Sequence, residues 1–229
     1  MKFDTFDKYL AADTTLPPQA LLTAWDCLAA YRDDLVLVGG LAIRYLTKPP
    51  VAGQPGALTL DVDFAISIGA GHGMYSNIRE TLSGHGFKWT GERFVRIYAG
   101  LILHIDLLTD NGYADTGSVV VDDGLNVSVL PGIDRALGCW REVSVTGETL
   151  LGVTQTQQVK VAEVGPILAL KLNAFGGPTG RKAGKDAHDI FYLVTNYVDG
   201  VDAAVAGFQQ EKSAGNRAMR HALRCLEEY

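Results

Sequence analysis

The sequence predicts an α/β (α+β) protein, with a sheet domain that includes N-terminal helices over residues 1–165 and a helical subdomain over residues 166–229. In the first part, short apolar runs alternate with helical apolar spacing, which is typical of strands and helices packed in layers. From Pro166 onward the apolar spacing is helical. Charge divides the chain at nearly the same place, because residues 1–170 carry 12 basic and 19 acidic side chains while residues 171–229 carry 8 and 7.

The first elements follow from apolar and turn signals. A helix is expected to begin at Pro17-Pro18, because apolar residues then recur at helical spacing. A buried strand over residues 35–38 ends at Gly39-Gly40, and a second helix over residues 41–46 stops before Pro49-Pro50.

The rest of the chain is assigned in the same way. In order, we expect a turn-rich loop at 51–56, a strand at 58–68, a helix at 74–82, strands at 93–98 and 101–108, short strands and loops over 110–165, and helices at 167–175, 187–197, 201–208 and 215–228.

Composition excludes several classes of protein. With 229 residues, 47% of them apolar and 20% charged, the chain can bury a core without disulfide or metal support. Cys27, Cys139 and Cys225 are widely spaced and form neither a disulfide framework nor a zinc pattern, which fits a reducing compartment. No apolar run approaches the ~20 residues of a membrane helix, and the first residues hold no apolar signal region, so we expect a cytoplasmic protein with no membrane partner. A net charge of −6 argues against non-specific coating of nucleic acid, but it permits a local basic surface.

Three carboxylates stand out on two predicted strands. Asp61 and Asp63 alternate along one strand and therefore share a face, together with Thr59. Asp106 lies in the apolar run 101–108. Two like charges side by side call for a cation between them, and oxygen ligands favour Mg²⁺ or Mn²⁺. The alternative is that Asp61 and Asp63 face solvent on an edge strand and that Asp106 ends its strand.

The turn Gly39-Gly40 carries a strand into a helix. Two residues without Cβ allow a phosphate to approach backbone N–H groups at a helix N-terminus, although a tight turn alone also explains them. Together with the three acids, the turn predicts that a triphosphate lies on the glycines and that its metals lie on the carboxylates.

The arrangement resembles the DNA-polymerase-β-like nucleotidyltransferase superfamily. The similar segments are Val38-Gly39-Gly40, Asp61-Val62-Asp63 and Ile105-Asp106-Leu107. More narrowly, residues 38–44 and 59–64 resemble the AbiEii/AbiGii toxin-type branch, as do Leu170–Ala174, with its Lys-x-x-Ala segment, and Lys185–Ile190, with its Lys-Asp-x-x-Asp segment. The resemblance covers roughly residues 30–195.

This resemblance implies a nucleotidyltransferase-type mixed sheet and transfer of NMP from an NTP, with release of pyrophosphate. Relatives suggest an RNA acceptor, tRNA in some cases, and a cognate antitoxin protein as partner. Asp61 and Asp63 would hold Mg²⁺ or Mn²⁺, and Asp106 would complete the metal site and deprotonate the acceptor. Lys171 would neutralise phosphate charge, and Asp186 or Asp189 would orient Lys171 or bind the base edge.

Gly39, Gly40, Arg44 and Thr59 complete the expected nucleotide contacts, together with Asp186 and Asp189. One position departs from the branch: Ala57 stands where an arginine often precedes the Thr by two residues. A phosphate-contacting arginine is then either missing or supplied by Arg44 or Arg96.

The leading hypothesis is a toxin-like, metal-dependent nucleotidyltransferase acting on an RNA or protein hydroxyl. The alternatives are a small-molecule (antibiotic) nucleotidyltransferase and a catalytically silent nucleotide-binding or antitoxin-like partner. The helix spacing of Arg217, Arg220, His221 and Arg224 places them on one face, which is either solvated or grips an acceptor.

Overall fold

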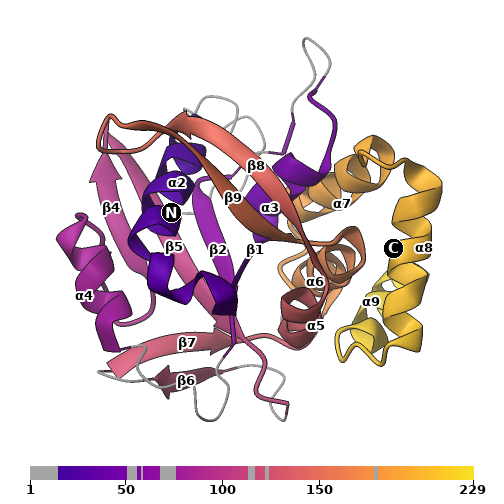
Figure 1. Cartoon of the computed structure of the whole chain (residues 1–229). Coiled ribbons are helices and arrows are strands. Elements are labelled where there is room, and N and C mark those ends of the chain that lie inside the picture. The colour runs from indigo at the N-terminus through magenta and orange to yellow at the C-terminus, as the bar shows by residue number, and fades with distance from the viewer. Residues whose placement is uncertain are drawn as a thin grey trace.

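The computed structural model describes residues 15–50, 56–57, 59–67, 76–112, 117–121, 124–177 and 180–229. In these parts of the chain, nine strands form one mixed sheet with helices around it, as the sequence predicts (Figure 1). The strand order is β3-β4-β5-β2-β1-β9-β8, with β7 beside β5 and β6 beside β7. The strands are β1 (Leu35–Val38), β2 (Asp61–Ile66), β3 (Lys88–Trp89), β4 (Phe94–Tyr98), β5 (Leu101–Thr109), β6 (Ser118–Val121), β7 (Leu125–Val129), β8 (Trp140–Glu148) and β9 (Thr154–Ala162).

Helices pack against this sheet and extend beyond it. They are α2 (Leu16–Cys27), the 3₁₀ helix η1 (Ala29–Asp34), α3 (Gly39–Leu46), α4 (Ser76–Gly84), α5 (Ile133–Gly138), α6 (Val164–Gly176), α7 (Gly184–Asn196), α8 (Val201–Ser213) and α9 (Met219–Glu228). The helix expected at Pro17-Pro18 and the strand expected over residues 35–38 are confirmed as α2 and β1.

The centre of the sheet is buried because its strands are apolar. All four residues of β1 are at most 1% exposed. This strand runs antiparallel to β2 and parallel to β9, and β2 runs parallel to β5. The register of the sheet therefore brings together the end of β1, the start of β2 and the middle of β5.

The C-terminal helices α6 to α9 gather at one end of the molecule, coloured orange to yellow in Figure 1. Helix α6 is central among them and approaches α8 closely, since a Cβ on Gly165 would lie 2.4 Å from the carbonyl oxygen of Gly207. Ile167 and Leu168 of α6 belong to the same core as the sheet. A smaller apolar cluster lies wholly within these helices and consists of Ala169, Leu172, Ala218, Met219, Ala222 and Cys225. The division at residue 165 stays a prediction.

The region 110–165 differs from the prediction of short strands and loops. Strands β8 and β9 are nine residues each and form a long antiparallel hairpin. The sequence signal is weak because most of their side chains are polar and at least partly exposed; Val145 and Val159 are among the few that reach the core. Helix α5 was also not anticipated.

Some predicted features lie outside the described residues. They include most of the loop at 51–56, the two ends of the strand at 58–68 and the start of the helix at 74–82. Within the described part of the chain, every helix is too short or too polar to cross a membrane.

Candidate active site

The turn between β1 and α3 brings backbone against a carboxylate. Gly39 has φ +71°, a conformation that favours glycine. A Cβ on Gly39 would lie 2.0 Å from Oδ2 of Asp63, and a Cβ on Gly40 would lie 2.9 Å from Cβ of Thr59. The absence of side chains at both glycines is therefore what allows Asp63 and Thr59 to approach the N-terminus of α3.

Sheet register places the three acids on one face. In the parallel pair of β2 and β5, Asp63 lies opposite Asp106 and Asp61 lies opposite His104. Because the side chains alternate along each strand, these four side chains project from the same side of the sheet. Asp61 is 7% exposed and His104 is 6% exposed, so the site is set into the protein surface. Burial lowers the pKa of His104, in spite of the nearby charge of Asp61.

Arg93 is a functional candidate that sequence reasoning missed. Its Nε donates to Oδ1 of Asp106 at 2.8 Å, and its second guanidinium nitrogen donates to Oδ2. Burial opposes the charge of Arg93, but the bond to Asp106 and the charges of Asp61 and Asp63 outweigh burial, so its pKa lies above the ordinary value. Arg93 lies two residues before Val95, whose register partner is His104. The alternation of side chains along the strand expected at residues 93–98 was the available signal. How that strand aligns with β5 could not be read from the sequence.

Of the other predicted phosphate contacts, Thr59 lies at this turn, whereas Arg96 and Arg44 do not. Thr59 is buried, and its hydroxyl accepts from Asp61 N–H at 3.1 Å and donates to Asp61 C=O at 3.2 Å, so it fixes the start of β2. Arg96 pairs with Leu103, which puts it on the face opposite Asp106, and it donates to the carbonyl of His85 at 2.7 Å. Arg44 lies one turn along α3 from Gly40 and lines a separate cavity.

A second group of charges is buried where α6 meets α7. Lys171 of α6 donates to Oδ2 of Asp189 at 2.6 Å and lies 3.6 Å from Oδ1 of Asp186. The same Oδ2 of Asp189 accepts from Lys185 at 2.9 Å, and Asp186 forms two hydrogen bonds with Arg181, at 2.7 and 2.9 Å. Asp186 and Asp189 are both 0% exposed. The second oxygen of Asp189, Oδ1, has no hydrogen-bond partner among the described residues.

Mutual attraction favours the charged forms of Lys171 and Asp189. Burial disfavours the ammonium of Lys171, but Asp189 and Asp186 outweigh it and raise the pKa of Lys171. For Asp189, burial is likewise outweighed, by Lys171 and Lys185, and its pKa lies below the ordinary value. Burial and the charge of Lys171 lower the pKa of Lys185. The charge of Asp63 also acts on Lys171, which links this cluster to the acids of the sheet.

A comparison with protein families identifies the family of the chain. The model of the family "Nucleotidyl transferase AbiEii toxin, Type IV TA system" matches residues 20–226. The chain belongs to this family. It is therefore a nucleotidyltransferase of the AbiEii toxin family, which uses a nucleoside triphosphate and belongs to type IV toxin–antitoxin systems.

Two further comparisons add little about the substrate. None of the curated proteins compared with the chain matches it. Among solved structures, the chain is similar to the solution structure of the antibiotic-resistance factor ANT(2'')-Ia, with 12% sequence identity and a TM-score of 0.48 over 93% of this chain and 99% of that chain. A likeness this distant does not extend to substrates.

The acids of this AbiEii-family site have the right chemistry for Mg²⁺ or Mn²⁺. Carboxylate oxygens are the ligands that these hard cations prefer, and Asp63 and Asp106 are neighbours in the sheet. Among the described residues, however, no three acidic, histidine or cysteine side chains are already gathered around one point as metal ligands. Both oxygens of Asp106 are bonded to Arg93 instead. The donor set thus suits the metal by its chemistry, and Asp106 would have to leave Arg93 in order to bind it.

Proposed function

We propose that this AbiEii-family nucleotidyltransferase moves a nucleoside monophosphate to a hydroxyl of an RNA, tRNA above all, or of a protein. The observation that carries the proposal is the position of Asp63, which lies against the backbone of Gly39 and opposite Asp106 in the sheet register. A helix N-terminus beside paired carboxylates suits a triphosphate together with its counter-ion.

Each residue of the site has a distinct task in this reaction. The N–H groups at the start of α3 bind phosphate oxygens beside Gly39 and Gly40. Lys171, held by Asp189 at 2.6 Å, neutralises phosphate charge. Asp61 and Asp63 would hold the metal, with Asp106 as the third ligand; when bound, Mg²⁺ or Mn²⁺ neutralises the triphosphate and makes its phosphorus more electrophilic.

In the transfer step, one bond to phosphorus forms as another breaks. The acceptor hydroxyl oxygen bonds to the α-phosphorus while the bond from that phosphorus to the bridging oxygen breaks, and pyrophosphate leaves in line. Asp106 accepts the hydroxyl proton. Arg93, displaced from Asp106, remains beside the site and can bind the negative charge that develops on the phosphate oxygens.

The test is transfer of label from each α-³²P-labelled NTP in turn. Purified protein is incubated with Mg²⁺ and either total tRNA or a protein extract, and the products are separated by size. We expect label from one NTP on one class of macromolecule, and none with Asp61→Ala/Asp63→Ala. Asp33→Ala is the matched control, because its side chain is fully exposed on the surface.

The outcomes separate the alternatives. Label on tRNA or on a protein that depends on Asp61 and Asp63 supports the proposal and names the acceptor. Consumption of NTP only when a small amino- or hydroxyl-bearing compound is added would favour a small-molecule transferase. NTP binding without any transfer would favour a catalytically silent protein and contradict the proposal.

A further inference from the structure

Arg141 of β8 links the start of α6 to the end of α7. Its guanidinium donates to both carboxylate oxygens of Glu163, the residue before α6, at 2.9 and 2.8 Å. It also donates to the hydroxyl of Tyr197, directly after α7, at 2.6 Å and to Oδ2 of Asp199 at 2.9 Å. The hydroxyl of Tyr197 in turn donates to Glu163 at 3.2 Å. These four residues are here called the Arg141 clamp.

The carboxylate of Glu163 serves the clamp rather than its own helix. Glu163 occupies the N-cap position of α6, where a side chain often accepts from the first N–H groups of the helix. No such side-chain bond forms here, because both carboxylate oxygens are bonded to Arg141. The start of α6 is thus tied to β8 and to the end of α7.

A second contact joins α6 to α7 at a matching height. Lys171 lies eight residues after Glu163 on α6, and Asp189 lies eight residues before Tyr197 on α7. At 1.5 Å per residue, both spacings correspond to about 12 Å along the helix axes. Because the start of α6 lies beside the end of α7, the helices run in opposite directions. The equal spacing brings the ammonium of Lys171 to Asp189 at 2.6 Å.

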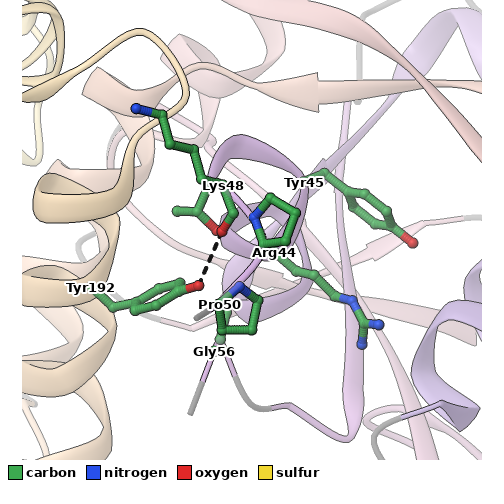
Figure 2. Close-up of a pocket in the computed structure, with 9 residues that line it drawn as sticks. Arg44, Tyr45, Lys48, Pro50, Gly56 and Tyr192 are labelled. Atoms are coloured by element: carbon green, nitrogen blue, oxygen red, sulfur yellow. Dashed lines mark hydrogen bonds between the residues drawn. The ribbon is translucent and has the colours of Figure 1, made fainter. Parts of the chain in front are cut away.

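Helix α7 is also anchored to α3, independently of the clamp. The hydroxyl of Tyr192 donates to the carbonyl of Lys48 at 3.2 Å, as Figure 2 shows. The N–H of Lys48 donates to the carbonyl of Asn196 at 2.9 Å. Since α3 begins at the glycine turn of the site, these bonds place α7, and with it Asp189, relative to the turn.

The side of the clamp toward α8 is loosely packed. A cavity of about 430 Å³ is lined by the clamp, by the first turn of α6 and by α8. Side chains that border a cavity have room to shift, whereas those in a close-packed core do not. On this side of the clamp, hydrogen bonds therefore fix the distance between the start of α6 and the end of α7.

The clamp lies nearer to solvent than the charges it faces along the helices. The side chains of Arg141, Glu163 and Asp199 are 32%, 24% and 52% exposed. Ion pairs this open to water contribute little to the free energy of unfolding. Asp189 is 0% exposed, so water does not compensate for a displacement of its partner Lys171.

We propose that Arg141 is a positioning residue for nucleotidyl transfer, because its clamp sets where along α7 the ammonium of Lys171 lies. The inference rests on the proposed function, which assigns Lys171 to the charge of the phosphates, and it adds a residue of β8 to that site. A shift of α6 along α7 by one residue, about 1.5 Å, would break the bond between Lys171 and Asp189. Misplacement of a group at a reacting centre by about 1 Å lowers the rate about 100-fold.

The test compares Arg141→Gln with Arg135→Gln. Arg135 is the matched control, because its guanidinium also binds a glutamate through two hydrogen bonds, to Glu211 at 3.0 Å each, and its side chain is 29% exposed. That pair joins α5 to α8, which carry none of the residues assigned to the site. For each variant, kcat and the KM for NTP are measured well below its melting temperature, with the acceptor that label transfer identifies.

We expect Arg141→Gln to lower kcat about 10- to 100-fold and to change the KM for NTP by less than about threefold, because the N–H groups of α3 and the metal still bind the triphosphate. Arg135→Gln should keep kcat within about twofold of wild type. Saturating NTP should not restore Arg141→Gln, since a ligand recovers unfolded protein by mass action but does not realign a helix. Arg141→Gln/Glu163→Gln should be no slower than the slower single variant, because both changes break one contact.

An unchanged kcat in Arg141→Gln, or an equal loss of kcat in both arginine variants, would overturn the inference. So would recovery of Arg141→Gln at saturating NTP, because the clamp would then serve the fold alone.

Melting temperatures test the same link without the reaction. Asp189 lies about 12 Å along α7 from the residues that Arg141 binds, and changes at sites this far apart usually have additive effects on stability. We expect Arg141→Gln to lower the melting temperature less in an Asp189→Asn background than in wild type, because the Lys171–Asp189 pair is then already broken. Additive shifts would count against the inference. If wild type transfers label to no acceptor, the proposed function fails, and this comparison alone decides whether Arg141 aligns α6 with α7.

Discussion

Arg93 and Asp106 form a bidentate ion pair at the centre of the acidic face, where the guanidinium also interacts with Asp61 and Asp63. The two side chains are 27% and 13% exposed, so the pair is only partly open to water. The guanidinium of Arg93 is thus a cation placed among three carboxylates. Arg93 bonds both carboxylate oxygens of Asp106. The proposed mechanism requires the same carboxylate as a metal ligand and as the base that accepts the hydroxyl proton.

The first prediction is that Arg93 and a divalent metal ion compete for Asp106. Arg93→Gln should destabilise the metal-free protein by about 1–3 kcal/mol, because the hydrogen bonds to a charged partner are lost and three like charges remain together. The same change should strengthen Mn²⁺ binding about tenfold in the absence of NTP, because Asp106 no longer has to leave Arg93. Thermal unfolding with and without Mn²⁺ measures both effects.

Two controls assign the effect to Asp106. In an Asp106→Asn background, Arg93→Gln should add little, because the pair is already broken. Arg220→Gln removes an exposed arginine of α9 and should change stability by less than about 1 kcal/mol. If Mn²⁺ stabilises wild type and Arg93→Gln equally, then arginine and metal do not compete.

The contrast between the acids and Arg93 shows what the sequence could and could not predict. Asp61 and Asp63 share a face because alternation along a strand is local, and Gly39-Gly40 is recognisable as a turn. The pairing of Arg93 with Asp106 depends on how β4 aligns with β5, which is a tertiary property that no local pattern encodes. The hairpin of β8 and β9 was missed for a related reason, since its partly exposed polar strands lack the apolar alternation on which strand prediction relies.

The second prediction concerns the close approach at the turn. Gly39→Ala would place Cβ 2.0 Å from Oδ2 of Asp63 at a φ of +71°. We expect a loss of stability of at least about 1 kcal/mol from the left-handed conformation alone, and a loss of NTP affinity because Asp63 must move. Gly84→Ala on α4 is the matched control, because a Cβ there meets nothing within 4 Å. Unfolding experiments measure the loss of stability, and nucleotide titration measures the loss of NTP affinity. Unchanged NTP affinity in Gly39→Ala would contradict the assigned position of Asp63.

The third prediction tests whether Lys171 is held for its charge. Lys171→Met should cost about 3–5 kcal/mol, since among the described residues it leaves buried Asp189 with Lys185 alone as its ion-pair partner. Adding Asp189→Asn should recover part of that stability, because the uncompensated charge is then removed. Nucleotidyl transfer should remain lost in the double variant, which separates the phosphate contact from the structural pair.

A surface lysine provides the comparison for that result. Lys212 is exposed near the C-terminal end of α8, and Lys212→Met should change stability by less than about 1 kcal/mol. Full recovery of transfer in the Lys171→Met/Asp189→Asn protein would show that Lys171 serves the fold alone.

The last prediction is a pH dependence that arises from Asp189. Its pKa is lowered in the folded protein because Lys171 and Lys185 outweigh its burial, whereas in the unfolded chain it returns to about 3.9. The ion pairs therefore contribute their full stability above about pH 4, and that contribution is lost as the pH falls through the folded pKa, because the unfolded state binds the proton first.

The melting temperature of wild type should exceed that of Asp189→Asn by a constant amount near neutral pH, and the difference should shrink below about pH 4. Asp33→Asn, at a fully exposed position, should follow wild type throughout. A difference that already shrinks between neutral pH and about pH 5 would mean that the carboxyl of Asp189 has a raised pKa, contrary to the ion pairs assigned to it.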